Sequence, residues 1–211
     1  MKKGLFITVE GTDGTGKTTQ LEHMKEYFIA QGRDVLFTRE PGGTPISEKI
    51  RSIILDKKNK EMAPMTEALL YAASRAQHIA QIIKPALEHG KIVVCDRFVD
   101  SSIAYQGYGR GLGETVSLIN SYAIGQWLPD MTFLLKMDPS IGRERIHRGS
   151  KDRLEIEGRD FYDRVYRGYI DLEKKFPSRI IGVEADRPIE AVWEEIRTHL
   201  ERIIGAEDGI R

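Results

Sequence analysis

A glycine-rich loop, GTDGTGKT from Gly11 to Thr18, constrains the fold of this chain more than any other segment. It matches the pattern G-x-x-x-x-G-K-[ST] at every fixed position, follows an apolar run that starts at Leu5, and opens a helical stretch at Lys17. Glycines let the backbone curl so that several N–H groups converge on phosphate oxygens, and the helix N-terminus adds about half a positive charge. The loop therefore predicts a strand-loop-helix unit that binds a nucleoside triphosphate.

The roles within this loop follow from the chemistry of its side chains. Lys17 is expected to reach the β- and γ-phosphates, and the hydroxyl of Thr18 is expected to bind Mg²⁺. The alternative is a strand-to-helix turn that only happens to be rich in glycine. The motif does not choose between GTPases, motor ATPases and small-molecule kinases. The expected ATP-binding residues are Gly11, Thr12, Asp13, Gly14, Thr15, Gly16, Lys17 and Thr18.

The rest of the chain alternates apolar runs of strand length with longer helical stretches, which is typical of an α/β fold on a parallel sheet. Five strands are expected, starting at Leu5, Asp34, Lys91, Met131 and Arg179. Helices are expected over 17–31, 64–88, 114–127, 139–148, 160–176 and 188–204. Pro85 should disturb the second of them. The length of 211 residues fits a single domain over 1–211.

Charge and cysteine content narrow the class of protein. Lys plus Arg equals Asp plus Glu at 32 each, so no global field attracts a nucleic-acid polymer or an anionic membrane. No segment approaches the apolar length of a membrane span. The single cysteine, Cys95, lies in an apolar run and excludes a disulfide framework or a cysteine metal cluster. We therefore expect a cytoplasmic protein with a local anion site.

The strand KIVVCDR from Lys91 ends in two residues suited to phosphate chemistry, Asp96 and Arg97. They fall at the carboxyl edge, where parallel sheets collect their ligands. Asp96 is placed to meet Mg²⁺ through water, and Arg97 suits a phosphate held between donor and acceptor. A salt bridge at a strand end is the alternative.

A second basic segment, PSIGRERIHRGSKDRLE from Pro139, predicts a lid over about 143–156. Such a lid would close over the triphosphate, exclude water and deliver an arginine to the transferring group. The alternative is a solvated helix face whose bases pair with neighbouring acids, and it stays open for each single arginine. The basic residues are Arg143, Arg145, Arg148, Lys151 and Arg153.

The helix from Glu67 combines an apolar stripe with a second face that suits a nucleobase. On that second face Tyr71, Arg75 and His78 point the same way, and stacking with bidentate hydrogen bonding is how proteins read a base edge. A half-exposed Tyr beside a surface Arg is the alternative, and His78 is expected to be structural. The stripe, expected to face the core, comprises Leu69, Ala72, Ala76, Ile79, Ala80 and Ile83.

Three segments give the chain a close resemblance to the thymidylate kinases, which phosphorylate thymidine monophosphate (dTMP). They are VEGTDGTGKTTQ from Val9, REPGGTPISEKIR from Arg39 and DRFVDSSIAYQGYGRGLG from Asp96. LLYAASRAQHI from Leu69 and DRLEIEGRDFYDRVYRGY from Asp152 also fit, so the resemblance covers nearly the whole chain. It implies the P-loop nucleoside monophosphate kinase fold, ATP and dTMP as substrates, Mg²⁺ as cofactor, a role in making dTTP, and a homodimer.

The resemblance also implies residue roles. Asp13 would approach the sugar 3′-hydroxyl, with Glu10 close by. Tyr71 would stack on thymine, Arg75 would hydrogen-bond its edge, and Arg97 would bind the acceptor phosphate. In this family an aromatic side chain near the sugar 2′ position gives the preference for deoxyribose. The other residues implied at the acceptor are Pro41, within the loop Glu40 to Gly43, and Ser101, Tyr105 and Gln106.

Two departures from parts of the family matter. Gly14 stands where some members carry an arginine in the phosphate loop. The members that carry glycine there have their basic residues in the lid, and this chain resembles them. Arg153 is then the main candidate for the transferring arginine and Arg148 the second, beside Lys17 and Arg97. In addition, Tyr71 replaces the phenylalanine of many members.

The expected reaction is in-line transfer of the γ-phosphoryl group of Mg-ATP to dTMP without a general base. One rival is a kinase for another nucleotide or nucleoside. Another is a regulatory GTPase or an ATP-dependent binding module. Common GTPases carry N-K-x-D, and the nearest string here, NKEM from Asn59, lacks the aspartate.

Overall fold

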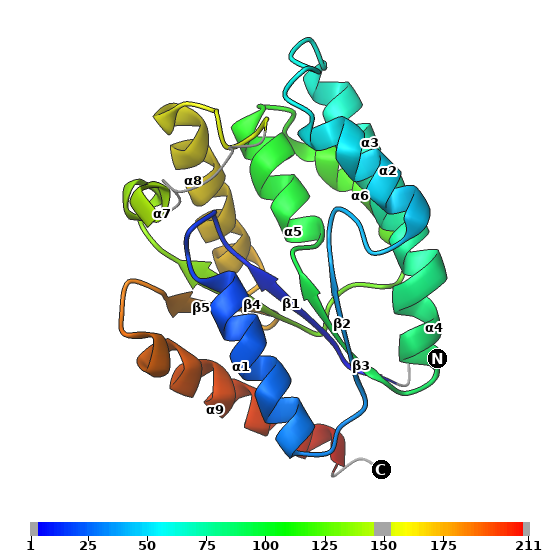
Figure 1. Cartoon of the computed structure of the whole chain (residues 1–211), viewed down its shortest axis with the longest axis vertical. Helices are drawn as coiled ribbons and strands as arrows, with labels where there is room; N and C mark the ends of the chain where they lie inside the picture. Colours follow the sequence, from blue (N-terminus) through cyan, green and yellow to red (C-terminus); the bar gives the residue numbers. More distant parts are fainter. Residues whose placement is uncertain (1–3, 146–152, 209–211) are drawn as a thin grey trace.

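One five-stranded sheet forms the centre of the protein (Figure 1), in a computed structural model that describes residues 4–145 and 153–208. All strand pairs are parallel, and the strand order is β2-β3-β1-β4-β5. The five apolar runs form these strands, which confirms the expected α/β class. They are β1 (Phe6–Glu10), β2 (Val35–Arg39), β3 (Ile92–Asp96), β4 (Met131–Lys136) and β5 (Ile180–Glu184).

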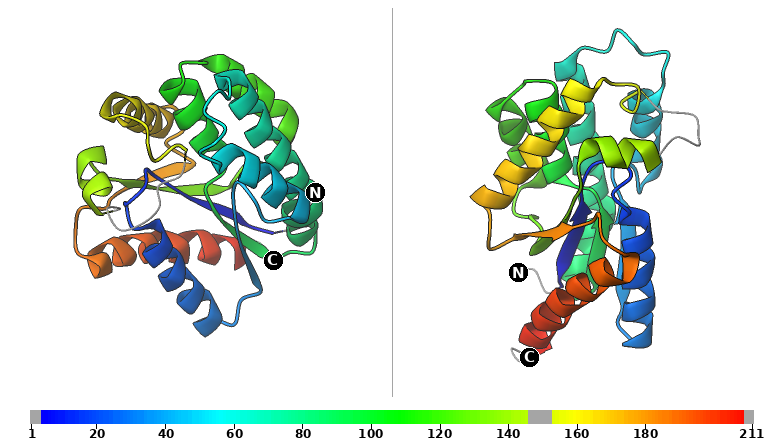
Figure 2. Two further views of the ribbon diagram at one scale, coloured as in Figure 1. Left: turned by 45° about the horizontal axis from the view of Figure 1, so that its top comes forward. Right: turned by 90° about the vertical axis from the view of Figure 1, so that its left-hand side faces the viewer.

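Helices cover both faces of the sheet (Figure 2). On one face Ile7 and Val9 of β1 pack against α1 (Lys17–Ala30) and α9 (Ile189–Asp208). On the other face Phe6 packs into a separate apolar cluster. Because successive strand side chains point to opposite faces, a strand covered on both sides is buried along its whole length, and every position of β1 is buried, including the polar Thr8 and Glu10.

Most of the expected helices lie close to their predicted bounds. Besides α1 and α9, they are α6 (Glu114–Ile124), α7 (Pro139–Arg145) and α8 (Arg159–Lys175). The lid expected over 143–156 and the helix expected over 139–148 extend into residues 146–152, which lie outside the described ranges. Across the described residues, no helix combines the length and the apolar character that crossing a membrane requires.

The helix predicted over 64–88 consists of three pieces. They are α3 (Pro64–His78), the π-helical turn η1 (Ile79–Ile83) and α4 (Lys84–Glu88). Pro85 has no N–H to donate, and its ring would crowd the carbonyl four residues earlier in a regular α-helix. A wider turn just before it relieves that conflict. The disturbance was therefore predicted at the right residue.

Three elements were missed in the connections. They are α2 (Pro45–Leu55), α5 (Val99–Ser102) and the π-helical segment η2 (Ile103–Gly109). The start of α2 is readable in hindsight, because Thr44 accepts a hydrogen bond from the backbone N–H of Ser47 at 3.1 Å and Pro45 occupies the first turn. No periodicity marks η2, which carries two expected pocket residues, Tyr105 and Gln106.

The core face predicted for α3 is partly wrong. Leu69 is 50% exposed, and Ala76 and Ala80 are exposed as well. The inward face instead includes Arg75 and His78, which are 1% and 0% exposed. Both are buried because each finds polar partners inside the protein, so their polarity does not force them outward.

Candidate active site

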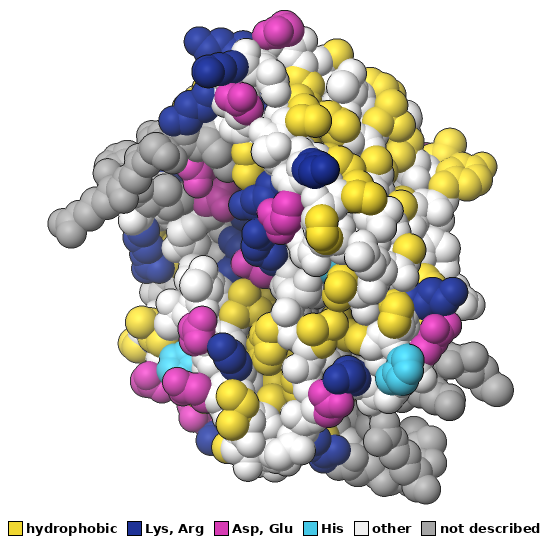
Figure 3. Space-filling model, turned by 45° about the vertical axis from the view of Figure 1, so that its right-hand side comes forward, with side chains coloured by type: hydrophobic (Ala, Val, Ile, Leu, Met, Phe, Trp, Pro, Cys, Tyr) yellow, Lys and Arg dark blue, Asp and Glu magenta, His cyan; other side chains and the backbone are white. Residues whose placement is uncertain are grey.

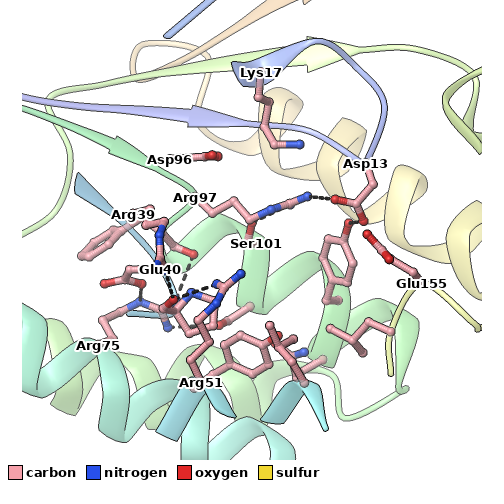
Figure 4. A pocket seen from close by; sticks show the side chains of 18 of the residues that line it. Asp13, Lys17, Arg39, Glu40, Arg51, Arg75, Asp96, Arg97, Ser101 and Glu155 are labelled. Carbon is pink, nitrogen blue, oxygen red and sulfur yellow. Dashed lines mark hydrogen bonds and ion pairs between the residues drawn. The ribbon is translucent and has the colours of Figure 1, made fainter. Parts of the chain in front are cut away.

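A cavity of about 480 Å³ lies at the carboxyl ends of the central strands (Figure 4). It brings together residues from the phosphate loop, the end of β3, α3 and η2. Glu10, Gly11, Thr12 and Thr15 are not among the residues that line it. The expected residues that do line it are Asp13, Gly14, Gly16, Lys17, Thr18, Pro41, Tyr71, Arg75, Asp96, Arg97, Ser101, Tyr105 and Gln106.

The phosphate loop is curled as its glycines allow. Gly11, Gly14 and Gly16 have positive φ, and α1 starts directly after Gly16. The Nζ of Lys17 donates to the carbonyl oxygens of Gly11 and Thr12 at 3.1 and 2.9 Å, so the ammonium group lies within the curl of the loop. Burial lowers the pKa of Lys17 to about 8, and a phosphate beside it would favour the charged form.

Gly14 is in backbone contact with α7. A Cβ placed on Gly14 would lie 2.1 Å from the carbonyl oxygen of Gly142, and one on Gly142 would lie 2.6 Å from the carbonyl oxygen of Asp13. Two glycines therefore allow the phosphate loop and α7 to touch. A side chain at either position would push the two backbones apart.

Arg97 is held in an unusual backbone conformation. Its φ is 65°, the one positive value at a non-glycine position among the described residues. Glu10 accepts hydrogen bonds from the N–H of Phe98 at 2.7 Å and of Ser101 at 3.3 Å, and from the hydroxyls of Ser101 and Tyr169. These bonds fix the chain directly after Arg97, at the point where β3 has ended and the arginine enters the cavity.

The guanidinium of Arg97 is aimed at the phosphate loop. Its Nη2 donates to Oδ1 of Asp13 at 2.6 Å, and its Nη1 donates to Ser101 and Tyr169 at 3.2 and 3.3 Å (Figure 4). It also lies 5.2 Å from the ring centre of Tyr105. Burial would raise the pKa of Asp13, but Arg97 and Lys17 outweigh it and lower that pKa. Asp13 therefore links the phosphate loop to Arg97 at the end of β3 as an ionised carboxylate.

Asp96 and Thr18, the two residues expected to meet Mg²⁺, both line the cavity. Oδ1 of Asp96 is buried and has no hydrogen-bond partner among the described residues, as expected for an oxygen that meets water around a cation. No group of three or more His, Cys, Asp or Glu in residues 4–145 and 153–208 could hold a metal alone. The residues thus fit a Mg²⁺ that is bound largely by phosphate oxygens.

Arg75 is a buried hub rather than a surface side chain. Its Nε donates to Glu40 at 2.8 Å, and its Nη2 donates to the carbonyl of Phe98 at 3.0 Å. Its Nη1 donates to Ser102 and Asn120. These four bonds leave one of the five guanidinium N–H groups for the cavity. The surface alternative for Arg75 is therefore wrong.

His78 also bonds to Glu40, 3.0 Å from its Nδ1, while its Nε2 lies 2.7 Å from Oγ1 of Thr38. It ties α3 to the end of β2. This contact fits the structural role expected for the ring.

Several residues of the cavity were missed in the sequence. Arg39 and Arg51 both donate to the carbonyl of Pro41, at 3.0 and 2.8 Å, and both line the cavity. Arg39 ends β2 at the same sheet edge as Asp96, so the rule that selected Asp96 also selects Arg39. Arg51 lies on the missed helix α2. Tyr169, on α8, does not line the cavity, but its hydroxyl reaches Arg97, a contact that no sequence pattern indicated.

The lid arginines do not meet the phosphate loop within the described residues. Arg153 is 6% exposed; its Nε donates to the carbonyl of Ile54 at 2.7 Å and its Nη2 to Glu67 at 2.6 Å. It therefore points to α2 and α3 in this structure. Arg148 lies outside the described residues.

Comparison with known proteins agrees with this geometry. The model of the family "Thymidylate kinase" matches residues 9–196. This chain belongs to the thymidylate kinase family. It is an ATP-dependent nucleoside monophosphate kinase that phosphorylates dTMP to the diphosphate, on the route to dTTP. Membership of this family excludes the alternative that the chain is a regulatory GTPase.

Individual relatives match along nearly the whole chain. A thymidylate kinase of Clostridium novyi is 46% identical over 204 residues, covering 95% of this chain and 100% of the relative. One of Oceanobacillus iheyensis is 51% identical over 196 residues, covering 91% and 87%. The crystal structure of thymidylate kinase from Ehrlichia chaffeensis superposes with a TM-score of 0.78 at 36% identity, covering 93% of this chain and 98% of that one.

The buried carboxyl of Glu10 predicts a pH-dependent stability. Burial and then the charge of Asp100 raise its pKa from 4.5 to about 7. The unfolded chain thus loses the proton of Glu10 near pH 4.5, whereas the folded protein keeps it until about pH 7. Between these two values the folded state binds more protons than the unfolded state, so the free energy of unfolding falls as the pH rises. Relative to Glu10→Gln, the wild-type free energy of unfolding should fall by roughly 3 kcal/mol across the window and then level off.

Urea denaturation at a series of pH values measures this difference. Glu26→Gln, at an exposed site on α1, is the matched control and should show no such change. A difference between wild type and Glu10→Gln that stays constant with pH would contradict the assignment.

Proposed function

We propose that this thymidylate kinase aligns the two phosphates between Lys17 and Arg97 and transfers the γ-phosphoryl group in line. The observation that carries the proposal is the contact of Arg97 with Asp13, which joins the phosphate loop to the acceptor side of one cavity. The loop from Gly11 to Thr18 would bind ATP, and Arg97, Arg39 and Arg51 would surround the phosphate of dTMP. Figure 4 shows these arginines facing a shared space.

The chemistry needs positioning and charge neutralisation rather than proton removal. The attacking phosphate oxygen is already anionic, so no general base is required. Lys17 would neutralise charge on the β- and γ-phosphates, and Arg97 would neutralise charge that develops between donor and acceptor. Because Glu10 fixes the backbone of Arg97, little reorganisation is needed as charge builds up.

The residues present fit Mg²⁺ at the triphosphate. The hydroxyl of Thr18 would hold the ion together with phosphate oxygens, and Asp96 would reach it through water. The ion would supply charge neutralisation between the β- and γ-phosphates. Support comes from the buried, unpartnered Oδ1 of Asp96.

Thymine would lie between Tyr71 and the residues of η2. Tyr71 is half-buried and lines the cavity, so its ring can stack on the base. Arg75 can offer its remaining N–H to a base carbonyl, and Oε1 of Gln106 is buried without a partner among the described residues. Tyr105, whose hydroxyl donates to Asp13 at 3.3 Å, would lie beside the sugar, where Asp13 would receive the 3′-hydroxyl, with Glu10 close behind it.

We also place this chain in the subgroup with glycine in the phosphate loop and the transferring arginine in the lid. The contact of Gly14 with Gly142 supports this, because it leaves no space for an arginine side chain at position 14. Arg148 then becomes the first candidate for that arginine, since Arg153 pairs with Glu67 in this structure. The single-domain organisation with a lid over about 143–156 and the cytoplasmic location stay predictions.

A homodimer is supported by the outward face of α2, α3 and α6. Large apolar side chains are exposed on all three helices, and Figure 3 shows apolar side chains gathered over this upper right part of the molecule. A contiguous exposed apolar surface of this kind is usually a site where a partner protein binds. Helices α2 and α3, and α3 and α6, lie against each other. The exposed residues are Ile46, Ile53, Met65, Leu69, Leu118 and Tyr122.

Replacing Arg97 tests the transfer mechanism. Arg97→Ala should lower kcat by roughly 10³, because an arginine supplied to a phosphoryl transition state contributes on that order. The measurement is steady-state ADP release with dTMP as acceptor. Arg202→Ala, at an exposed position of α9, is the control and should keep the wild-type rate. Normal turnover of Arg97→Ala would refute the role of Arg97.

Charge placed on the apolar face tests the homodimer. Leu69→Glu combined with Tyr122→Glu should reduce the mass in solution from twice 24.0 kDa to 24.0 kDa, since two carboxylates would have to be buried in the interface. Light scattering after size-exclusion chromatography gives the mass. Ile29→Glu, 68% exposed on α1, is the control. A wild-type mass of 24.0 kDa, or a double variant that remains dimeric, would contradict the interface.

A further inference from the structure

We propose that Glu67 is a positioning residue that fixes the side-chain amide of Gln106, and that it thereby sets which pyrimidine base the cavity accepts. The inference rests on the proposed binding of the nucleobase beside Gln106. It concerns a carboxylate that does not line the cavity itself.

Glu67 is fully buried, and its two oxygens are saturated with donors. Oε1 accepts from Nε2 of Gln106 at 2.8 Å and from Nε of Arg110 at 3.3 Å. Oε2 accepts from Nη2 of Arg110 at 3.1 Å and from Nη2 of Arg153 at 2.6 Å. Burial would raise the pKa of Glu67, but the hydrogen bonds and charges of these partners outweigh it and lower that pKa. The group is therefore an ionised acceptor at neutral pH.

An ionised carboxylate accepts hydrogen bonds and donates none, so it can face only the NH₂ end of the Gln106 amide. The carbonyl end must then point the other way. Oε1 of Gln106 is in fact buried without a partner among the described residues, and Gln106 lines the cavity. A buried acceptor of this kind loses free energy unless a ligand donates to it.

The polarity of that oxygen selects the edge of the base. Thymine and uracil carry an N–H at ring position 3, which can donate to Oε1. Cytosine carries an unprotonated nitrogen there, which would place two acceptors against each other. A site built to pair with one hydrogen-bonding pattern rejects the reversed pattern strongly, because its own buried group is left unpaired.

Glu67 also connects this amide to the segment that follows residue 152. Arg153 donates to Glu67, and Arg110 bridges Glu67 to Glu157. Leu154 and Glu155, between these two contacts, line the cavity. The same carboxylate therefore orients the amide in the pocket and seats part of the pocket wall.

The decisive comparison is between dUMP and dCMP, which both lack the thymine methyl group and differ only in the base edge. The wild-type enzyme should prefer dUMP in kcat/KM. In Glu67→Gln the new amide can turn either end to Gln106, so Gln106 can flip and present its NH₂ to cytosine. The ratio of kcat/KM for dUMP over dCMP should fall by about tenfold or more, chiefly through KM for the nucleoside monophosphate. KM for ATP should not change.

The control is Arg110→Lys, which disturbs the same carboxylate while Glu67 still faces Gln106. It should lower thermal stability and leave the dUMP to dCMP ratio near the wild-type value. A second variant, Glu67→Gln with Gln106→Glu, reverses the pair: the amide at 67 donates, and the carboxylate at 106 again offers an acceptor to the base. It should prefer dUMP, and it keeps the test valid if the single variant does not fold.

Failure of the proposed function and failure of the role of Glu67 give different results. If the wild-type enzyme phosphorylates neither dTMP nor dUMP, the proposed function fails. If it phosphorylates them and Glu67→Gln keeps the wild-type ratio, or the reversed pair prefers dCMP, the role of Glu67 is overturned. An equal fall of the ratio in Arg110→Lys would also overturn it, because general damage to the cluster would then explain the effect.

Discussion

The site depends on the hydrogen bonds that Glu10 accepts from the backbone of Phe98 and Ser101. They hold Arg97 at a positive φ, a conformation that costs free energy for a residue with a side chain. Without them the chain after β3 would not turn sharply enough to aim the guanidinium at Asp13. One buried carboxyl at the end of the central strand thus joins the start of the phosphate loop to the chain after β3 and to α8, which contributes Tyr169.

Buried polar groups repeat this arrangement elsewhere around the cavity. Glu40 holds Arg75 and His78, and Glu67 holds Gln106 together with two arginines. Each acid fixes the direction of its donors, and one donor of each acid, Arg75 for Glu40 and Gln106 for Glu67, lines the cavity. Fixed dipoles and charges of this kind bind a phosphate or a base without a large cost of reorganisation.

The sequence predicted the sheet and the phosphate loop because both depend on local patterns. The five apolar runs became the strands, and the glycines of the loop have the positive φ values that the motif requires. It failed where burial depends on partners far away in the chain. The stripe through Leu69 predicts the wrong core face, because Arg75 is buried by acceptors from three other segments, at Glu40, Phe98 to Ser102, and Asn120. Arg153 could not be placed either, because its partner Glu67 is 86 residues away.

The central claim is that Glu10 acts on phosphoryl transfer through Arg97, and a double-mutant cycle in single-turnover transfer tests it most directly. Glu10→Ala, Arg97→Ala and the double variant are compared with wild type at saturating ATP and dTMP. We predict that Glu10→Ala slows transfer in the wild-type background and has no further effect once Arg97 is absent. Losses that multiply in the double variant would show that the two residues act independently, and would contradict the account.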